Sequence, residues 1–197
     1  MVSLEERLDA VSTFILAFIV LIGTLFGLKI AYVVSTALVL PTTQGALYVS
    51  TSRVRVLAFL DAVPMQEGQL LVDLGCGDGR VLRAARKRYG VRGLGYELNL
   101  LAYLKAQLLC LGSKGIEIRR RNFWTADLSE ADTIFCYLFP DVMKKLSAKL
   151  KFDLKPGAVV VSCNFVLPGF NPDLVLRPGN SLDRDPIYVY QLEKSQT

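Results

Sequence analysis

Histidine is missing from the 197 residues, tryptophan occurs once, and cysteine occurs four times. The lack of histidine excludes serine–histidine triads, histidine metal ligands and histidine general bases. The cysteines stand too far apart for metal-ligand pairs, and no metal site is expected. They are expected to be reduced packing residues: Cys76, Cys110, Cys136 and Cys163.

Charge is missing from one long stretch near the N-terminus. Val11 to Leu28 holds no charged residue, and as a helix it would be about 27 Å long, close to the hydrocarbon thickness of a bilayer. After Lys29, the apolar stretch Ile30 to Leu40 can extend the helix while the lysine reaches the headgroups. We therefore predict a transmembrane helix over about residues 11–40, within an N-terminal anchor of residues 1–45.

Three other interpretations of this stretch fit less well. A cleaved signal peptide needs a basic leading region, but Arg7 is outweighed by nearby acids. A buried core helix is the second interpretation, but the uncharged run is longer than a small α/β domain usually buries. An amphipathic surface helix needs a polar face, which the stretch lacks. The sequence favours a single-pass membrane protein with the lipid bilayer as a partner.

The basic excess bears on orientation and on partners. Lysine and arginine total 23 against 18 aspartate and glutamate, a net charge of +5. Arg7 precedes the apolar stretch and three basic residues follow it, so the positive-inside rule predicts a catalytic domain on the cytoplasmic side. Basic clusters within residues 119–121 and 144–155 suit anionic headgroups or an acidic partner, or form a solvated helix face. No nucleic-acid-binding module is recognisable, and no nucleic-acid partner is expected.

The most informative pattern is a glycine-rich turn between two apolar runs. Residues 69–74 predict a strand covered on both faces, residues 79–89 a helix, and residues 92–97 the next strand. Glycines in the turn allow positive φ and let a ligand lie against the main chain, near the free N–H groups of the helix N-terminus. Glu97 ends the second strand, where a carboxylate can accept both hydroxyls of a ribose. The turn consists of Gly75, Cys76, Gly77, Asp78 and Gly79.

The spacing separates this turn from the dinucleotide fingerprint. That fingerprint is G-x-G-x-x-G, whereas this chain has G-x-G-x-G with Asp73 before it and Asp78 inside it. Acidic groups there would repel a pyrophosphate, but they suit S-adenosylmethionine (SAM), which carries an ammonium and a sulfonium and no phosphate. Here the sequence resembles the class I SAM-dependent methyltransferases, whose first motif is matched by Asp73 and the three glycines, and whose ribose-binding acid is matched by Glu97.

Four further stretches narrow the resemblance. They are similar to the membrane-anchored protein-lysine methyltransferases that modify the adenine nucleotide translocase and the c-subunit of ATP synthase. The resemblance covers about residues 46–170 and the apolar segment ahead of them. One departure is Asn122, where relatives often carry an acid, although an amide oxygen can still accept a hydrogen bond from an adenine amino group. The stretches are Tyr48-Val-Ser-Thr-Ser, Gly95-Tyr-Glu-Leu-Asn, Asn122-Phe-Trp and Tyr137-Leu-Phe-Pro.

The remaining pattern predicts the fold. A leading helix over residues 50–62 precedes the first strand, and strands and helices alternate after the second. Such alternation predicts a doubly wound, mostly parallel α/β sheet, Rossmann-like as in class I methyltransferases, within a domain of residues 46–197. Residues 173–177 and 187–192 resemble the antiparallel hairpin that closes that sheet. The alternating elements are helix 99–111, strands 115–120 and 132–138, helix 140–152 and strand 157–163.

Ligands of such sheets lie beyond the carboxyl ends of the strands, which groups the candidate site residues. Asp73 can orient the SAM ammonium and Glu97 can hold the ribose, while Asn122 and Phe123 can contact the edge and face of the adenine. Alternatively, Asp73 and Asn122 cap backbone groups and Phe123 packs in the core, the place we expect for Trp124.

The resemblance also implies a substrate channel lined by Tyr48, Thr51, Ser52 and Tyr137. Electron-rich tyrosine faces favour a developing alkylammonium. An alternative role for both tyrosines is packing, with the hydroxyl on a backbone carbonyl.

These observations favour a membrane-anchored SAM-dependent methyltransferase acting on lysine of a protein, a membrane protein among the candidates. Many relatives that methylate adenine or glutamine amines carry Asn/Asp-Pro-Pro-Tyr/Phe after the fourth strand, whereas this chain has Tyr137-Leu-Phe-Pro. Two alternatives stay open: methylation of a lipid, quinone or small amphiphile, and an inactive SAM-fold module that docks to a membrane complex. The intact motif argues against the second.

Overall fold

A computed structural model describes residues 4–43, 51–178 and 185–192. The chain divides into two compact units, residues 1–38 and 39–197. The predicted domain boundary, between residues 45 and 46, lies outside the described residues.

The first unit is the greater part of one helix, α1 (Leu4–Thr43). Its segment Val11–Val34 has 24 residues with a mean hydropathy of 2.5, and none of its most apolar stretch is buried within the structure. The hydroxyls of Ser12, Thr13 and Thr24 donate to carbonyls one turn earlier, so these polar groups are satisfied within the helix. The lack of burial argues against a core helix, and a membrane anchor or a signal sequence fits this segment.

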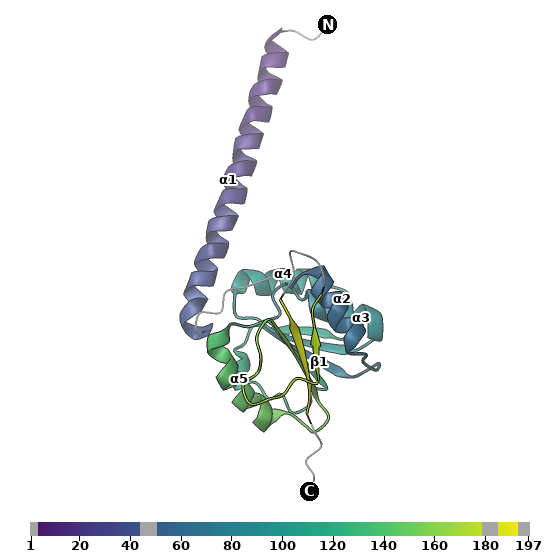
Figure 1. The fold of residues 1–197 in the computed structure, drawn as a ribbon. Helices are drawn as coiled ribbons and strands as arrows, with labels where there is room; N and C mark the ends of the chain where they lie inside the picture. The colour runs from purple at the N-terminus through teal and green to yellow at the C-terminus, as the bar shows by residue number, and fades with distance from the viewer. Residues whose placement is uncertain (1–3, 44–50, 179–184, 193–197) are drawn as a thin grey trace. The chain divides into compact units, whose positions relative to one another are not determined.

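The second unit is built on a central sheet (Figure 1). Its seven strands lie in the order β3-β2-β1-β4-β5-β7-β6. Strands β1 to β5 are parallel, and β7 is antiparallel to both β5 and β6. This is the predicted Rossmann-like sheet with its antiparallel closing strands. The strands are β1 (Leu70–Leu74), β2 (Arg92–Tyr96), β3 (Ile116–Arg119), β4 (Thr133–Cys136), β5 (Val159–Cys163), β6 (Leu174–Leu176) and β7 (Ile187–Gln191).

Helices cover both faces of the sheet because residues of the central strands point alternately to two apolar layers. Leu71 and Phe135 pack into the layer that holds α2, α3 and α4. Val72 and Ile134 pack into the opposite layer, which holds α5. The helices are α2 (Arg53–Ala62), α3 (Arg80–Tyr89), α4 (Leu100–Cys110) and α5 (Pro140–Asp153).

The predicted elements form at shifted ends. The leading helix begins at Arg53 and not at residue 50, because the Ser52 hydroxyl oxygen accepts the Arg55 N–H and caps it. The strand predicted over 132–138 ends at Cys136, so Tyr137 lies in the loop before α5. A short 3₁₀ helix, η1 (Phe123–Thr125), was not predicted.

Candidate functional site

The predicted cofactor residues all lie at the carboxyl ends of the parallel strands. Strand β1 is flanked by β2 on one side and β4 on the other, so the strand order reverses there. Such a switch point is where doubly wound sheets bind ligands. The turn at 75–79 follows β1, Glu97 follows β2, and Tyr137 follows β4.

The glycine turn is held by backbone bonds and left-handed backbone angles. Gly75, Gly77 and Gly79 have φ values of 83°, 54° and 71°, a region that side chains of L-residues rarely allow. The N–H groups of Gly75 and Cys76 donate to the Tyr96 carbonyl at 2.9 and 3.0 Å. The turn therefore lies against the end of β2, and Gly79 leads directly into α3.

Close packing explains a glycine in the neighbouring strand as well. A Cβ added at Gly95 would lie 2.6 Å from the Cys76 Sγ and 2.9 Å from the Leu82 Cδ1. No real Cβ tolerates such contacts, so a glycine at this position lets the motif turn approach β2. Cys76, a predicted cofactor residue, is thus a buried packing group whose side chain faces Gly95.

Glu97 is joined to the motif turn by its carboxylate. The Gly77 N–H donates to its Oε2 at 2.9 Å, and the Asn99 N–H donates to its Oε1 at 2.8 Å. Burial raises the pKa of Glu97, and the hydrogen bonds from Asn99 and Gly77 offset part of that rise. Both oxygens keep free lone pairs, so the carboxylate can still accept bonds from a ligand's hydroxyl groups.

Asp73 and Asp78 have opposite environments although both are buried. Burial raises the pKa of Asp73 well above its usual value, and the negative charges of Glu97 and Asp78 add to the rise. Burial also acts to raise the pKa of Asp78, but the hydrogen bonds and charge of Arg80, together with the charge of Lys105, outweigh it and lower that pKa. Arg80 Nε and Nη2 lie 2.9 and 2.8 Å from the two Asp78 oxygens. Asp78 therefore supports the turn, while the ionised form of Asp73 is the one that a bound cation would stabilise.

The adenine candidates lie after β3. The Asn122 Oδ1 accepts the Trp124 N–H at 3.0 Å and caps η1, the alternative role foreseen for it. The rings of Phe123 and Trp124 have centroids 4.7 Å apart, and the Lys145 Nζ lies 4.5 Å from the Trp124 ring centroid. Both aromatic residues are only partly buried, so Trp124 is less enclosed than a core residue.

Two arginine side chains contact the predicted substrate residues. Arg55 is a buried residue, 5% exposed. Its guanidinium lies 5.1 Å from the centroid of the half-buried Tyr137 ring and pairs with Asp185 at 2.6 Å. Arg80 Nη1 donates to the Thr51 carbonyl at 3.0 Å, which ties the segment before α2 to the motif turn. Ser52 caps α2. Tyr48 lies outside the described residues.

Sequence reasoning missed Asn99, Arg80 and Arg55 as supporting residues. Asn99 caps α4 through two N–H groups and holds Glu97 with its own N–H, and an asparagine just before an apolar run is a sequence signal for such a cap. The contacts of Arg80 with Thr51 and of Arg55 with Tyr137 join residues far apart in the chain, for which a single sequence carries no signal.

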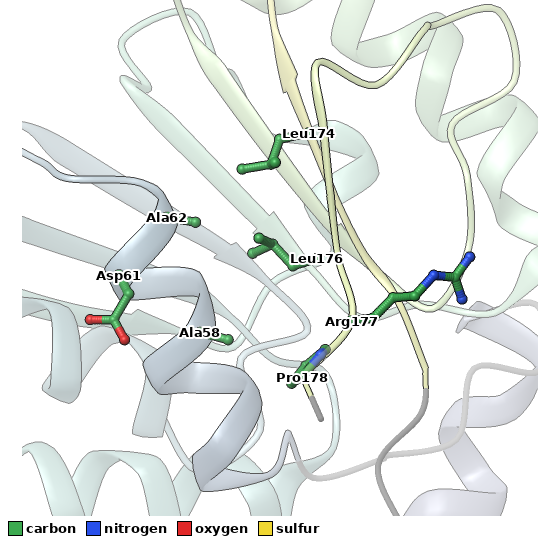
Figure 2. A pocket seen from close by; sticks show the side chains of 7 residues that line it. All are labelled: Ala58, Asp61, Ala62, Leu174, Leu176, Arg177 and Pro178. Atoms are coloured by element: carbon green, nitrogen blue, oxygen red, sulfur yellow. The ribbon is translucent and has the colours of Figure 1, made fainter. Parts of the chain in front are cut away.

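A separate groove of about 420 Å³ lies between α2 and β6 (Figure 2). Leu174 and Leu176 point toward Ala58 and Ala62 across it. None of the predicted cofactor or substrate residues lines it. The groove is therefore distinct from the carboxyl-end site.

The carboxyl-end site fits SAM by the chemistry of its groups. The turn leaves room beside Gly75, where an added Cβ would meet only Leu138, at 3.5 Å, whereas a Cβ at Gly79 would lie 3.0 Å from the Cys110 Sγ. The buried acids Asp73 and Glu97 suit a cationic ligand that carries a ribose. No group of histidine, cysteine or acidic residues suited to a metal ion occurs among the residues described.

Comparisons with known proteins agree with this geometry. Residues 73–174 match the family described as the ANTKMT methyltransferase domain. A protein-lysine N-methyltransferase of Saccharolobus islandicus is 32% identical, over 73% of this chain and 91% of that protein. An adenine nucleotide translocase lysine N-methyltransferase of Mus musculus is 33% identical, over 75% of this chain and 64% of that protein. An ATP synthase c-subunit lysine N-methyltransferase of Rattus norvegicus is 32% identical, over 64% and 58%.

Solved structures share the fold. An RNA methyltransferase from Salinibacter ruber, in complex with S-adenosyl-L-homocysteine, is 31% identical with a TM-score of 0.69, over 76% of this chain and 97% of that one. S-adenosyl-L-homocysteine is the form that SAM takes once its methyl group has been transferred. The bound product in that relative, together with the family match, identifies SAM as the cofactor of this fold.

Proposed function

This chain belongs to the ANTKMT methyltransferase-domain family of SAM-dependent protein-lysine N-methyltransferases, and on that premise we propose that it methylates a lysine of a membrane protein. The observation that carries the proposal is the hydrogen bond between the motif turn and Glu97 at the switch point of the sheet. The relatives of this chain named above are lysine methyltransferases.

Within this proposal the cofactor supplies an activated methyl group when bound, and the protein supplies position and environment. Glu97 accepts the ribose hydroxyls, Asp73 in its ionised form faces the ammonium, and Asn122 with Phe123 contacts the adenine. Gly75 leaves the backbone open to the cofactor, and the positive φ values of Gly77 and Gly79 shape the turn around it. The incoming lysine must arrive as a neutral amine, since an ammonium has no lone pair with which to attack.

Tyr137, Thr51 and Ser52 form the substrate side in this proposal, together with Tyr48. Arg55 faces the Tyr137 ring at 5.1 Å and so restricts its orientation. Arg80 connects Thr51 to Asp78, which places the segment before α2 beside the cofactor turn.

The membrane part of the proposal rests on α1 and on the relatives. The Val11–Val34 segment is long and apolar enough to span a bilayer, and two relatives act on adenine nucleotide translocase and on the c-subunit of ATP synthase, which are membrane proteins. The bias of positive charge toward the C-terminal side of the segment favours a catalytic domain on the cytoplasmic side.

The test is to incubate the full chain with methyl-labelled SAM and membranes of its own cell, and then to separate protein, lipid and RNA. We expect label on lysine of a membrane protein, located by mass spectrometry. A Glu97→Ala variant is the matched control and should transfer little label. Label only in lipid would favour the amphiphile alternative, and label only in RNA would favour the activity of the Salinibacter relative. Absence of transfer together with absence of SAM binding would favour the docking module.

A further inference from the structure

Helix α4 is arranged with its large side chains outward. Its buried positions carry small residues, Ala102, Ala106 and Cys110. Leu100, Leu104, Leu108 and Leu111, on the helix and at its C-cap, are 40%, 51%, 66% and 73% exposed, and Leu109 is 41% exposed. Packing against the sheet therefore does not account for the leucines.

Four of these leucines form one face of the helix. Positions 100, 104, 108 and 111 are four, four and three residues apart, which places them on one side of a helix. Lys105 is the one charged residue of α4. Its side chain is 57% exposed, and its Nζ lies 3.5 Å from the Asp78 Oδ2 of the motif turn. When the outer face of a helix is apolar as well as its inner face, that outer face usually contacts lipid or another protein.

We propose that the leucine face of α4, Leu100, Leu104, Leu108 and Leu111, lies in the surface of an anionic lipid bilayer. The inference rests on the proposed membrane anchoring. An apolar face with basic neighbours is the pattern of helices that lie in the lipid interface.

Charge favours lipid over a second copy of the chain as the occupant. The net charge is +5, and the exposed residues Lys105, Lys114, Arg120 and Arg121 lie on α4 or close to it in sequence. The Lys105 Nζ lies 3.5 Å from the Asp78 Oδ2, so this lysine is already paired and does not decide between the two occupants. In a dimer through this face, the exposed basic residues Lys114, Arg120 and Arg121 of the two copies would add like charges near the contact, whereas an anionic surface offers them phosphate groups.

The placement has a consequence for the site. Helix α4 begins at Leu100, directly after its cap Asn99, whose N–H holds Glu97. The leucine face therefore starts at the same edge of the sheet as the cofactor residues. A lipid-bound α4 would keep that edge near the headgroups, where a lysine at the membrane border of a protein substrate is accessible.

The experiment uses the full chain in vesicles of phosphatidylcholine and phosphatidylglycerol. All four native cysteines are buried, so Leu108→Cys can be labelled selectively with an environment-sensitive fluorophore. The matched control is Glu67→Cys, an exposed position before β1 at the opposite edge of the sheet. Quenching is measured with iodide in the water and with doxyl-labelled phosphatidylcholine in the bilayer.

We expect the label at 108 to be quenched several-fold more by the doxyl lipid than the label at 67, and to be shielded from iodide. Iodide quenching at 108 equal to that at 67 would overturn the inference. So would shielding from both quenchers, because that result means that protein covers the face. Flotation of the Glu67→Cys chain with the vesicles tests α1 separately, so anchoring can hold while the α4 inference fails.

A second variant keeps the test independent of one label. Leu104→Gln with Leu111→Gln, in the Leu108→Cys chain, should lower the doxyl quenching several-fold, because it removes apolar area on both sides of the probe. Val175→Gln, at a 41% exposed residue of β6, is the control and should leave the quenching unchanged. Equal quenching in all three chains would contradict a leucine face that binds lipid.

Discussion

At position 97 one carboxylate serves both the fold and, in our proposal, the ribose of SAM. Replacing Glu97 with alanine removes charge-assisted hydrogen bonds worth roughly 1.5–3 kcal/mol each, so SAM affinity should fall about tenfold or more. Calorimetry on the purified chain measures this loss. Glu117→Ala is the control, because that exposed acid of β3 pairs with Arg119 and should leave SAM affinity unchanged. Unchanged affinity in Glu97→Ala would remove Glu97 from the cofactor site.

The raised pKa of Asp73 predicts that SAM binding depends on pH. Burial, followed by the charges of Glu97 and Asp78, raises its pKa, so the free protein holds a proton there over a wider pH range than an exposed aspartate would. A bound ammonium and sulfonium favour the ionised form, so binding should release protons and the affinity should rise with pH through the raised pKa. Because the pKa of Asp73 is higher in the folded state than in the unfolded state, the folded state holds the proton more tightly. The contribution of Asp73 to folding stability therefore falls as the pH rises from the unfolded-state pKa toward the folded-state pKa.

Calorimetry in buffers of different ionisation enthalpy counts the released protons. Asp73→Asn should bind SAM more weakly and show a smaller release, the remainder belonging to Glu97, whose pKa is also raised. Identical proton release in the wild-type chain and in Asp73→Asn would assign the titration elsewhere.

Tyr137 separates catalysis from cofactor binding. If its ring lines the substrate channel, Tyr137→Ala should lower turnover on lysine about tenfold or more while changing SAM affinity by less than about twofold. Tyr137→Phe keeps the ring that faces Arg55 and should keep most of the turnover. Steady-state kinetics and calorimetry make the two measurements. A loss of SAM binding in Tyr137→Ala would place the tyrosine with the cofactor or the fold.

At the scale of elements, Ser52 has a structural role that competes with the proposed substrate role. Its hydroxyl oxygen accepts the Arg55 N–H at 3.3 Å and caps α2. Ser52→Ala should cost about 1 kcal/mol, which lowers the melting temperature by about 2–4 °C in a domain of this size. Ser52→Asp, another good cap, should restore it. Restored stability without restored turnover would show that the hydroxyl also contacts the substrate, and recovery of both would leave capping as its role.

How far the elements could be predicted depends on whether their signal is local. The turn at 75–79 was predictable because three closely spaced glycines at the end of an apolar run indicate a tight turn. All three glycines have positive φ in the structure. The end of β4 was not, since the apolar run continues through Leu138 while the strand stops at Cys136. The site followed the same rule: Glu97 was found from its spacing, whereas the contact of Arg55 with Tyr137 depends on residues brought together only by folding.

At the scale of the whole molecule, α1 decides whether the enzyme works at a membrane. Its 24-residue apolar segment would be about 36 Å long, enough to span the hydrocarbon core. The full-length chain should therefore stay with membranes after carbonate extraction. Leu21→Arg together with Ile22→Arg places charges at the middle of the segment, each costing roughly 2.5–3.5 kcal/mol of insertion, and should release the chain.

The same preparation distinguishes an anchor from a signal sequence and tests the orientation. An anchor keeps its N-terminal segment, so intact mass should match the full 197 residues, whereas a signal sequence would be cleaved and the mass would fall. Protease added outside sealed, right-side-out vesicles should leave the catalytic domain intact if the basic flank after α1 faces the cytoplasm. Digestion of that domain would reverse the orientation, and it would place the site away from the compartment in which SAM is made.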